Sequence, residues 1–413
     1  MPSREETGLW FEPLPADIRK QSDIGAEVHL GALSPPILDL ATLTEADKDT
    51  LRQALFENQV IAIRNQAGID PKTLPALARL FDPTASDIHS AGEKAVSDPR
   101  NILSAYKAGR LPCAPQVGII GSGTFKNYQG IPELEVIHLD HTAFHETPLT
   151  QEKLDAGYTR PYRWHMDTPF YERLPGDVTI LHAVQVPQLP DQTISFPDGS
   201  EEQIAAGATA FFSGARAFEL LTPEQQEFAL NTTVTYAPQA YEYIRHCKAT
   251  EDGMTIPTMG RETKAEDMSP WSWDKVAEHP MVWRNPGTDR PFLQVHGCCV
   301  YRLTTRDPST GNFSVMDDVE QVRATVYAMQ RRIWQAGHIY AHRWEEGDLV
   351  VFHNRGVMHS ITGQLAQYQK KDAEDEVDDT KKRLMWQCTM TSGTAPKAFR
   401  NYDGVNETGF VRV

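Results

Sequence analysis

The sequence predicts a mainly β fold in which helices pack outside a closed or two-sheet β core. Three observations support this prediction. Segments rich in β-branched and apolar residues recur from residue 177 onward, at 177–186, 207–214, 347–353 and 383–390. Long helical and loop insertions separate these segments, and strands do not alternate regularly with helices. Regular alternation would be expected of a Rossmann fold or a TIM barrel, so both folds are disfavoured.

The first 85 residues are predicted to form a helix, a strand and a second helix. A capping box at Thr44–Asp47 opens the first helix, and residues 59–64 form a short apolar strand. Asp70-Pro71 supplies an N-cap and a first-turn proline for the second helix. Residues 83–160 are rich in loop-forming residues, with Gly and Pro throughout and no clear periodicity, so we expect functional loops or disorder there.

The strand at 177–186 is followed by Pro187, and further elements then alternate irregularly with loops. Thr222-Pro223 opens a helix, and residues 291–296 are strand-like. Asp318 caps a long helix that Gly337 is expected to end. The acidic run at 372–379 is predicted to be a solvated loop before the last strand.

Composition narrows the class of protein. The formal net charge is −16, with 40 Lys and Arg against 56 Asp and Glu, which disfavours nucleic-acid and anionic-membrane partners. The five Cys are an odd number and include the adjacent pair Cys298-Cys299, so we expect reduced thiols and core packing for that pair. No apolar run approaches the roughly 18 residues of a membrane span, and no signal peptide is evident. A cytoplasmic location is therefore expected; the oligomeric state is not predicted.

Two His-x-Asp triplets are candidates for metal binding: His165-Met166-Asp167 and His138-Leu139-Asp140. Two imidazoles and one carboxylate on one face of an octahedron suit ferrous iron and leave positions open for chemistry. His359, in the segment 354–360 after a late strand, is the candidate for the second imidazole. In a jelly roll, a late-strand His can meet an early His-x-Asp at the mouth of the barrel.

Arg383 and Thr209 are candidates for holding a carboxylate beside that metal. Arg383 opens the apolar strand at 383–390, where its guanidinium could clamp a buried carboxylate with two hydrogen bonds. Thr209 lies in the strand at 207–214 and could donate its hydroxyl to the same group. Iron, two His, one Asp, one Arg and one Thr would complete a site for 2-oxoglutarate.

The order of these motifs resembles the taurine dioxygenase family of Fe(II)/2-oxoglutarate dioxygenases. The resemblance rests on His165-Met166-Asp167, Gly207-x-Thr209-x-Phe211-x-Ser213-Gly214, Asn354-Arg355-x-x-x-His359 and Arg383, and it covers most of the chain. It implies a double-stranded β-helix (jelly roll) and C–H oxidation with O2. It also implies His165, Asp167 and His359 as iron ligands, and Thr209 and Arg383 as 2-oxoglutarate ligands. We expect one catalytic domain over residues 1–413, with an acidic loop insertion at about 366–382.

The substrate side departs from the family pattern. Lys370 or Lys371 lies nearer the usual spacing from His359 than Arg383 does, but Arg383 alone begins a strand. Sulfonate-oxidising members carry a second Arg four residues after the first, where this chain has the neutral Gln387. A taurine-like substrate is therefore disfavoured.

The fungal xanthine dioxygenase branch is more similar. The features shared with it are Arg383-x-x-x-Gln387, Trp164, Asn285-Pro286 and Cys298-Cys299. That branch hydroxylates xanthine to urate and carries Asn where this chain has Thr389. Gln387 and Thr389, together with Lys126 and Asn127 in a Gly-bounded loop, are candidate substrate contacts.

The sequence thus predicts an Fe(II)/2-oxoglutarate-dependent dioxygenase that oxidises a small polar molecule, with xanthine or a related purine as the first candidate. One alternative is the oxidation or oxidative cyclisation of an amino acid in specialised metabolism. Another is a catalytically silent jelly-roll binding protein, although an intact ligand set argues against lost turnover. A zinc hydrolase built on the same triad is disfavoured, because no separate general base is evident.

Overall fold

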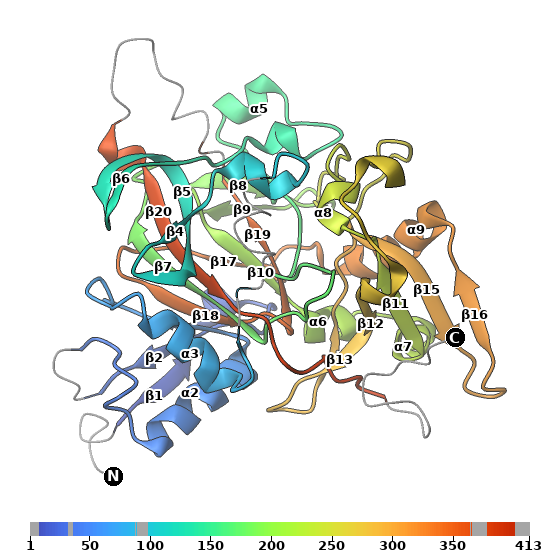
Figure 1. Ribbon diagram of the computed structural model, residues 1–413, viewed down its shortest axis with the longest axis horizontal. Helices are drawn as coiled ribbons and strands as arrows, with labels where there is room; N and C mark the ends of the chain where they lie inside the picture. The colour runs from blue at the N-terminus through green and yellow to red at the C-terminus, as the bar shows by residue number, and fades with distance from the viewer. Residues whose placement is uncertain are drawn as a thin grey trace.

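Two facing β-sheets form the centre of the protein, which is described here from a computed structural model for residues 8–31, 36–86, 88, 98–363, 365 and 378–400 (Figure 1). The larger sheet has the strand order β1 (Trp10–Pro13), β2 (Ala26–His29), β3 (Val60–Ile63), β18 (Leu349–His353), β7 (Val178–Gln185), β20 (Arg383–Thr389), β5 (Ala114–Tyr128) and β4 (Gly109–Leu111), and β6 (Ile131–Val136) pairs with β5. The smaller sheet has the order β17 (Tyr340–His342), β10 (Thr209–Ser213) and β19 (Val357–Ile361).

One buried cluster fills the space between these sheets. It joins Phe211 and Val357 of the smaller sheet to Leu181, Phe352 and Met385 of the larger one. From β3 through β18, β7 and β20 to β5, every pairing is antiparallel. The predicted jelly-roll core is thereby confirmed, and the predicted strands at 59–64, 177–186, 207–214, 347–353 and 383–390 all lie in it.

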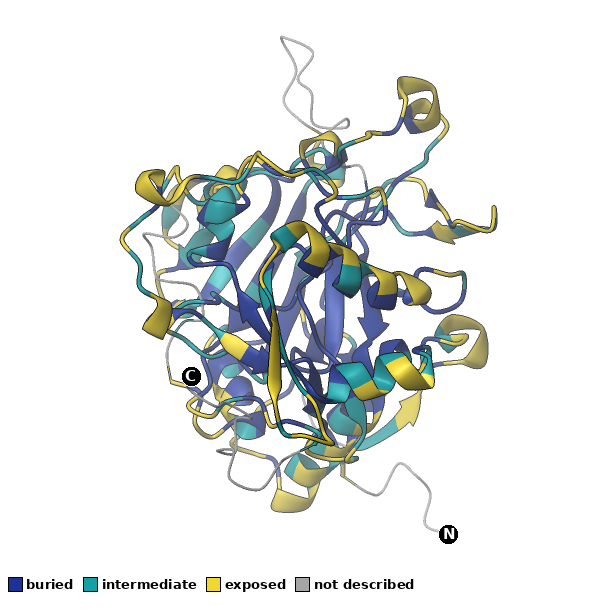
Figure 2. Cartoon of the chain, turned by 90° about the vertical axis from the view of Figure 1, so that its right-hand side faces the viewer, coloured by how far each residue is buried: buried dark blue, intermediate teal, exposed yellow. Residues whose placement is uncertain are grey.

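Two helices cover the outer face of the larger sheet. They are α2 (Glu45–Asn58) and α3 (Thr73–Phe81), whose Leu51, Leu55, Leu74 and Leu77 share a buried cluster with residues of β3, β7 and β18. The Thr44 hydroxyl accepts the backbone N–H of Asp47, as the capping box predicts. Figure 2 shows the result, with buried strands inside and helices whose outer surfaces are exposed.

The part of the chain between β10 and β17 builds a third layer beside the two facing sheets. A four-stranded sheet has the order β12 (Glu278–Pro280), β11 (Thr232–Tyr236), β15 (Val300–Arg306) and β16 (Phe313–Met316). The hairpins β8 (Gln192–Ser195)–β9 (Glu201–Ile204) and β13 (Val282–Arg284)–β14 (Pro291–Leu293) stand apart from it. The other α-helices in the described residues are α1 (Ala16–Arg19), α5 (Gln151–Asp155), α6 (Gly214–Glu219), α7 (Pro223–Leu230), α8 (Ala240–Tyr243) and α9 (Val319–Gln330).

Two predictions about individual elements are wrong. The helix capped by Asp318 ends at Gln330 and not at Gly337, because a 3₁₀ turn at Arg331–Ile333 replaces its last part. The segment 83–160 is not all loop, since it contains β5, a strand of 15 residues. Glycines interrupt the apolar pattern of β5, but they allow close backbone packing. A Cβ at Gly121 would lie 2.0 Å from the carbonyl oxygen of Arg383.

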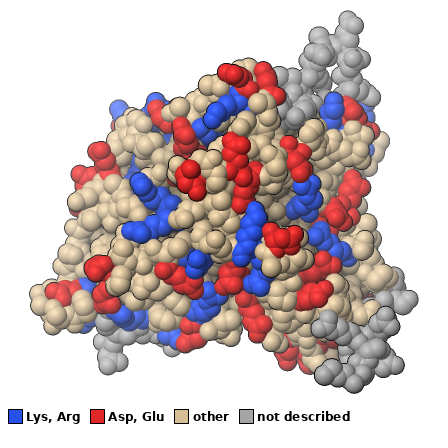
Figure 3. All heavy atoms as spheres, turned by 180° about the vertical axis from the view of Figure 1, so that it is seen from behind, with Lys and Arg blue, Asp and Glu red and all other residues tan. Residues whose placement is uncertain are grey.

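The surface carries both acidic and basic side chains, as expected from the composition. On the face seen in Figure 3, acidic and basic side chains are interspersed. Within the described ranges, no helix combines the length and the apolar character that crossing a bilayer requires. Residues 366–377 of the predicted acidic insertion, with Lys370 and Lys371, lie outside the described residues.

Candidate metal centre

The structure brings His165, Asp167 and His359 together. One ligand atom from each lies within 4.8 Å of the others. The Oδ1 atom of Asp167 is 3.9 Å from Nε2 of His165 and 3.7 Å from Nε2 of His359. Two nitrogens and one carboxylate oxygen that converge in this way fit ferrous iron, with one face of its coordination sphere left open.

Backbone hydrogen bonds join the two histidines directly. The N–H of each donates to the carbonyl of the other at 2.9 Å, which forms an isolated β-bridge between the His165 segment and β19. The two imidazole centroids are 4.0 Å apart. The fold thus sets the spacing of these ligands through the main chain.

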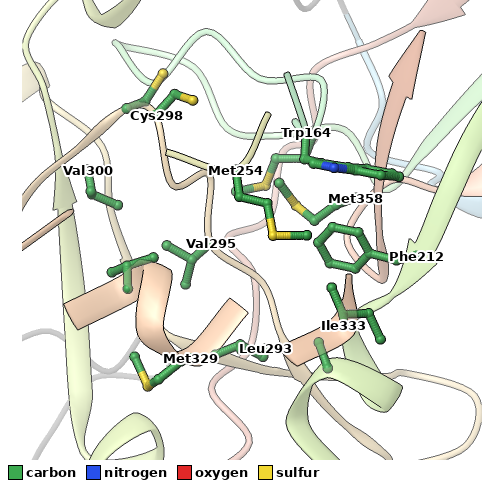
Figure 4. Close-up of a cluster of buried hydrophobic side chains, with 14 of the residues drawn as sticks. Trp164, Phe212, Met254, Leu293, Val295, Cys298, Val300, Met329, Ile333 and Met358 are labelled. Atoms are coloured by element: carbon green, nitrogen blue, oxygen red, sulfur yellow. The ribbon is translucent and has the colours of Figure 1, made fainter. Parts of the chain in front are cut away.

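The ring of His165 is oriented by its neighbours. Its Nδ1 is 2.8 Å from the carbonyl oxygen of Arg163, an atom that only accepts, so Nδ1 carries the hydrogen and Nε2 presents its lone pair. Trp164 anchors the segment, because its indole N–H donates to the Asp252 carbonyl at 2.9 Å and its ring packs against Phe212. Figure 4 shows Trp164 among Phe212, Met254 and Met358 in the core.

Asn354 holds the backbone at Asp167. Its Oδ1 accepts the N–H of Asp167 at 2.8 Å, and its Nδ2 donates to the Asp167 and Gly176 carbonyls at 2.9 Å each. The next residue, Arg355, pairs with Asp177 at 2.7 Å. The Asn354-Arg355 motif therefore ties the strand that leads to His359 to the loop that carries Asp167.

The other triplet, His138-Leu139-Asp140, does not form a metal-binding group in the described part of the chain. The Asp140 side chain accepts the N–H of Thr142 and lies 3.1 Å from His141. His138 is buried, with Nδ1 3.2 Å from the Tyr162 hydroxyl. Burial lowers the pKa of His138 to about 3, so its imidazole is neutral.

A cavity of about 240 Å³ adjoins the three ligands. Thr209, Arg383, Gln387 and Thr389 all line it, as the sequence predicts for residues that share one site. Further polar groups along its wall are Arg110, Gln116, Arg163, Tyr241 and His296. None of these five was predicted as a site residue. Tyr241 lies in the short helix α8 and His296 follows β14, where no periodic pattern marks a side chain as facing inward.

Arg383 is a buried cation that no carboxylate of the described residues approaches within ion-pairing distance. It begins β20 and is 3% exposed. Burial lowers the pKa of its guanidinium to about 10, which leaves it charged at neutral pH. A Cβ at Gly207 would lie 3.3 Å from Nε of Arg383, so the glycine leaves room for the guanidinium. A buried cation lining a cavity in this way is suited to bind an anion.

Thr209 supplies a hydrogen-bond donor to the same cavity. Its Oγ1 accepts the indole N–H of Trp344 at 3.2 Å, and because that N–H can only donate, the hydroxyl hydrogen of Thr209 is left to donate elsewhere. Arg383 and Thr209 together therefore fit a dicarboxylic cosubstrate whose remote carboxylate needs a cation and a donor.

Gln387 and Thr389 line the cavity and also contact one of the metal ligands. Both donate to Oδ2 of Asp167, at 3.1 and 3.0 Å. The sequence reasoning missed a third donor to this oxygen, Thr179 of β7, at 2.7 Å. The signal was a polar residue within the β-branched run at 177–186, but only strand register shows what it faces.

Lys126 and Asn127 are not brought to the cavity. They lie at the end of β5 beside the turn into β6, both are exposed, and neither is among the residues that line the cavity. The hairpin carries this end of the long strand away from the ligands. Their predicted role as substrate contacts has no support from their position.

Comparisons with known proteins show the family of the chain. The family model described as "Taurine catabolism dioxygenase TauD, TfdA family" matches residues 11–389. The α-ketoglutarate-dependent xanthine dioxygenase xanA of Emericella nidulans is 37% identical over 378 residues, which cover 91% of this chain and 96% of the relative. The xanthine dioxygenase xan1 of Schizosaccharomyces pombe is 35% identical over 392 residues, which cover 94% and 90%.

A solved structure shares the fold. The taurine dioxygenase of Burkholderia xenovorans superposes with a TM-score of 0.52 and 16% identity, covering 95% of this chain and 93% of the other. In this family α-ketoglutarate, which is 2-oxoglutarate, serves as cosubstrate with ferrous iron and O2. The chain belongs to the TauD/TfdA family and is an Fe(II)/2-oxoglutarate-dependent dioxygenase.

Proposed function

We propose that this enzyme oxidises a purine base, with xanthine as the first candidate. The observation that carries the proposal is the neutral amide of Gln387 in the cavity wall beside Asp167. Two relatives that are 35–37% identical over most of the chain are named xanthine dioxygenases, and both support this substrate class.

The orientation of Gln387 defines what it can offer. A carboxylate only accepts, so the amide nitrogen must face Asp167 and the amide oxygen is the atom left for a ligand. That oxygen suits an N–H of a purine. Arg110 and Gln116, elsewhere in the same wall, carry N–H donors that suit the carbonyl oxygens of a purinedione.

The charge of the cavity disfavours the amino-acid alternative. Among the described residues that line it, the only carboxylate is Asp167, whose Oδ1 faces the iron position, whereas Arg110, Arg163 and Arg383 are cationic. The ammonium group of an amino acid would find no carboxylate partner there. A purine with carbonyl groups and no ammonium avoids that cost.

The residues divide the work of the reaction between them. Bound iron and 2-oxoglutarate activate O2 for the oxidation of a substrate C–H bond. His165, Asp167 and His359 would hold the iron on one face, and Arg383 with Thr209 would hold the far carboxylate of 2-oxoglutarate. Apolar residues such as Ile120, Leu181 and Ile244 line the rest of the cavity and limit the access of water to it.

Succinate release tests the substrate. The iron-loaded enzyme with 2-oxoglutarate and O2 is expected to release succinate on addition of xanthine, with one oxygen atom incorporated into the purine by mass spectrometry. Taurine and a panel of amino acids serve as comparisons. Release driven by an amino acid and not by any purine would refute the proposal.

A further inference from the structure

Three hydrogen-bond donors converge on one oxygen of the iron-ligating carboxylate. Oδ2 of Asp167 accepts from the hydroxyl of Thr179 at 2.7 Å, from the hydroxyl of Thr389 at 3.0 Å and from the amide nitrogen of Gln387 at 3.1 Å. The other oxygen, Oδ1, faces the Nε2 atoms of His165 and His359. The two oxygens thus have separate partners.

The sheet builds this cluster of donors. Strands β7 and β20 are antiparallel neighbours, and Thr179 stands directly opposite Thr389 in their register. Gln387 precedes Thr389 by two residues and therefore lies on the same face of β20. All three side chains are thus fixed by one pairing of two central strands.

The hydroxyls also contact each other. Thr179 Oγ1 and Thr389 Oγ1 are 2.8 Å apart, and each hydroxyl has one hydrogen to donate. The two hydroxyl hydrogens are shared among three oxygen–oxygen contacts: each threonine with Oδ2, and the two threonines with each other. The direction in which one hydroxyl donates therefore depends on the other. Both threonines are buried, and in such surroundings the hydrogen bonds to a charged oxygen are strong.

We propose that Thr179, Thr389 and Gln387 are positioning residues that fix the Asp167 carboxylate, so that it offers the iron Oδ1 alone. The inference rests on the iron site and not on the identity of the substrate. Because the Thr389 hydroxyl is engaged by Asp167, Thr389 acts on the metal ligand, and the change from Asn at this position does not by itself report a change of substrate.

Metal affinity of the apoprotein provides the test. Mn(II) binding is measured by titration without 2-oxoglutarate and without substrate, for the wild type and for Thr179→Val, Thr389→Val and the double variant. Valine keeps the branched shape of threonine and replaces its hydroxyl with a methyl group, which cannot donate. Loss of an outer partner of a metal ligand typically weakens affinity by roughly 10- to 100-fold, and this range is expected for the double variant.

Two matched variants separate positioning from general stability. Thr389→Ser restores a hydroxyl and is expected to bind Mn(II) as the wild type does. Thr232→Val removes one hydroxyl of another cross-strand threonine pair, Thr232–Thr305 at 2.9 Å in the β11–β15 sheet, and is expected to leave Mn(II) affinity unchanged. Thermal unfolding of each apoprotein checks that the variants are folded.

Two results would overturn the proposal. One is Mn(II) affinity of the double variant within about twofold of the wild type. The other is a Thr389→Ser variant that binds Mn(II) as weakly as Thr389→Val. If metal affinity is unchanged while the KM for the substrate rises, the hydroxyls contact the substrate and do not position Asp167. A failure to oxidise xanthine bears on the proposed function alone.

Discussion

Replacing Arg383 with methionine should change the stability of the apoprotein and the binding of 2-oxoglutarate in opposite directions. Arg383 is buried without a carboxylate partner among the described residues, and burial lowers its pKa to about 10. The fall from an ordinary value of 12.5 corresponds to about 3 kcal/mol of unfavourable free energy in the folded apoprotein. Methionine has a similar length and no charge, so Arg383→Met is expected to raise the apoprotein's free energy of unfolding by about 1–3 kcal/mol.

The sign of this effect follows from the pKa. Since folding lowers the pKa of Arg383, the unfolded chain binds its proton more tightly than the folded chain. The penalty is present in full at every pH below about 10 and is relieved as the pH rises from there toward 12.5. An assay at neutral pH therefore measures the whole effect.

Binding of 2-oxoglutarate should respond in the opposite sense. Truncating one partner of a buried charge pair costs about 2–5 kcal/mol, which is a loss of roughly 30- to several-thousandfold in affinity. A ligand at 100 times its Kd raises the free energy of unfolding by about 2.7 kcal/mol. The variant should lose between about two thirds and all of this gain at the same 2-oxoglutarate concentration with Mn(II) present, as measured by urea unfolding.

Arg355 provides the matched control. It is also a buried arginine, but it pairs with Asp177 at 2.7 Å and donates to the Pro175 and Thr394 carbonyls. Arg355→Met breaks a satisfied buried pair and should destabilise the apoprotein by about 3–5 kcal/mol. The reasoning is refuted if Arg383→Met destabilises the apoprotein as Arg355→Met does, or if it keeps the stabilisation by 2-oxoglutarate.

Three further outcomes are expected. His165→Ala should abolish Mn(II) binding measured by titration, whereas His138→Ala should retain it; the reverse result would assign the metal to the other His-x-Asp triplet. Thr209→Val should raise the Kd of 2-oxoglutarate about 12- to 160-fold, the equivalent of one hydrogen bond to a charged carboxylate, and an unchanged Kd would show that Thr209 does not bind 2-oxoglutarate. Burial lowers the pKa of His353 to about 3, so the folded protein loses stability as the pH falls from 6.5 toward 3, by up to about 1.4 kcal/mol per pH unit for this residue. His353→Leu should make the plot of unfolding free energy against pH less steep by that amount, and an unchanged slope would contradict it.

The metal ligands could be predicted because local signals mark them. A His-x-Asp triplet is visible in the sequence itself, and the order of Thr209, His359 and Arg383 after it selects His165 over His138. The strands that carry these residues are apolar and β-branched, so their existence is also visible. The hydrogen bond between Thr209 and Trp344 depends on tertiary packing, and so does the space that Gly207 leaves for Arg383.

The contacts of Gln387 and Thr389 could not be predicted, for a physical reason. Their partner is set by the register of β20 against β7, and a slip of one residue would turn both side chains to the opposite face. Register is a property of the assembled sheet. The same limit applies to β5, where glycines that permit close contact with β20 mask the strand pattern.

The reciprocal backbone hydrogen bonds between His165 and His359 have a consequence for metal selection. Because backbone hydrogen bonds hold the imidazoles in place, the metal ion is not needed to fold the site. The apoprotein should therefore bind metal again without refolding. A prebuilt set of two nitrogens and one oxygen also discriminates poorly between divalent ions. Cobalt, nickel and copper generally bind such donors more tightly than ferrous iron does. Faithful loading with iron would then depend on which metals the cell makes available, so the purified protein should be assayed for its metal content before its activity is judged.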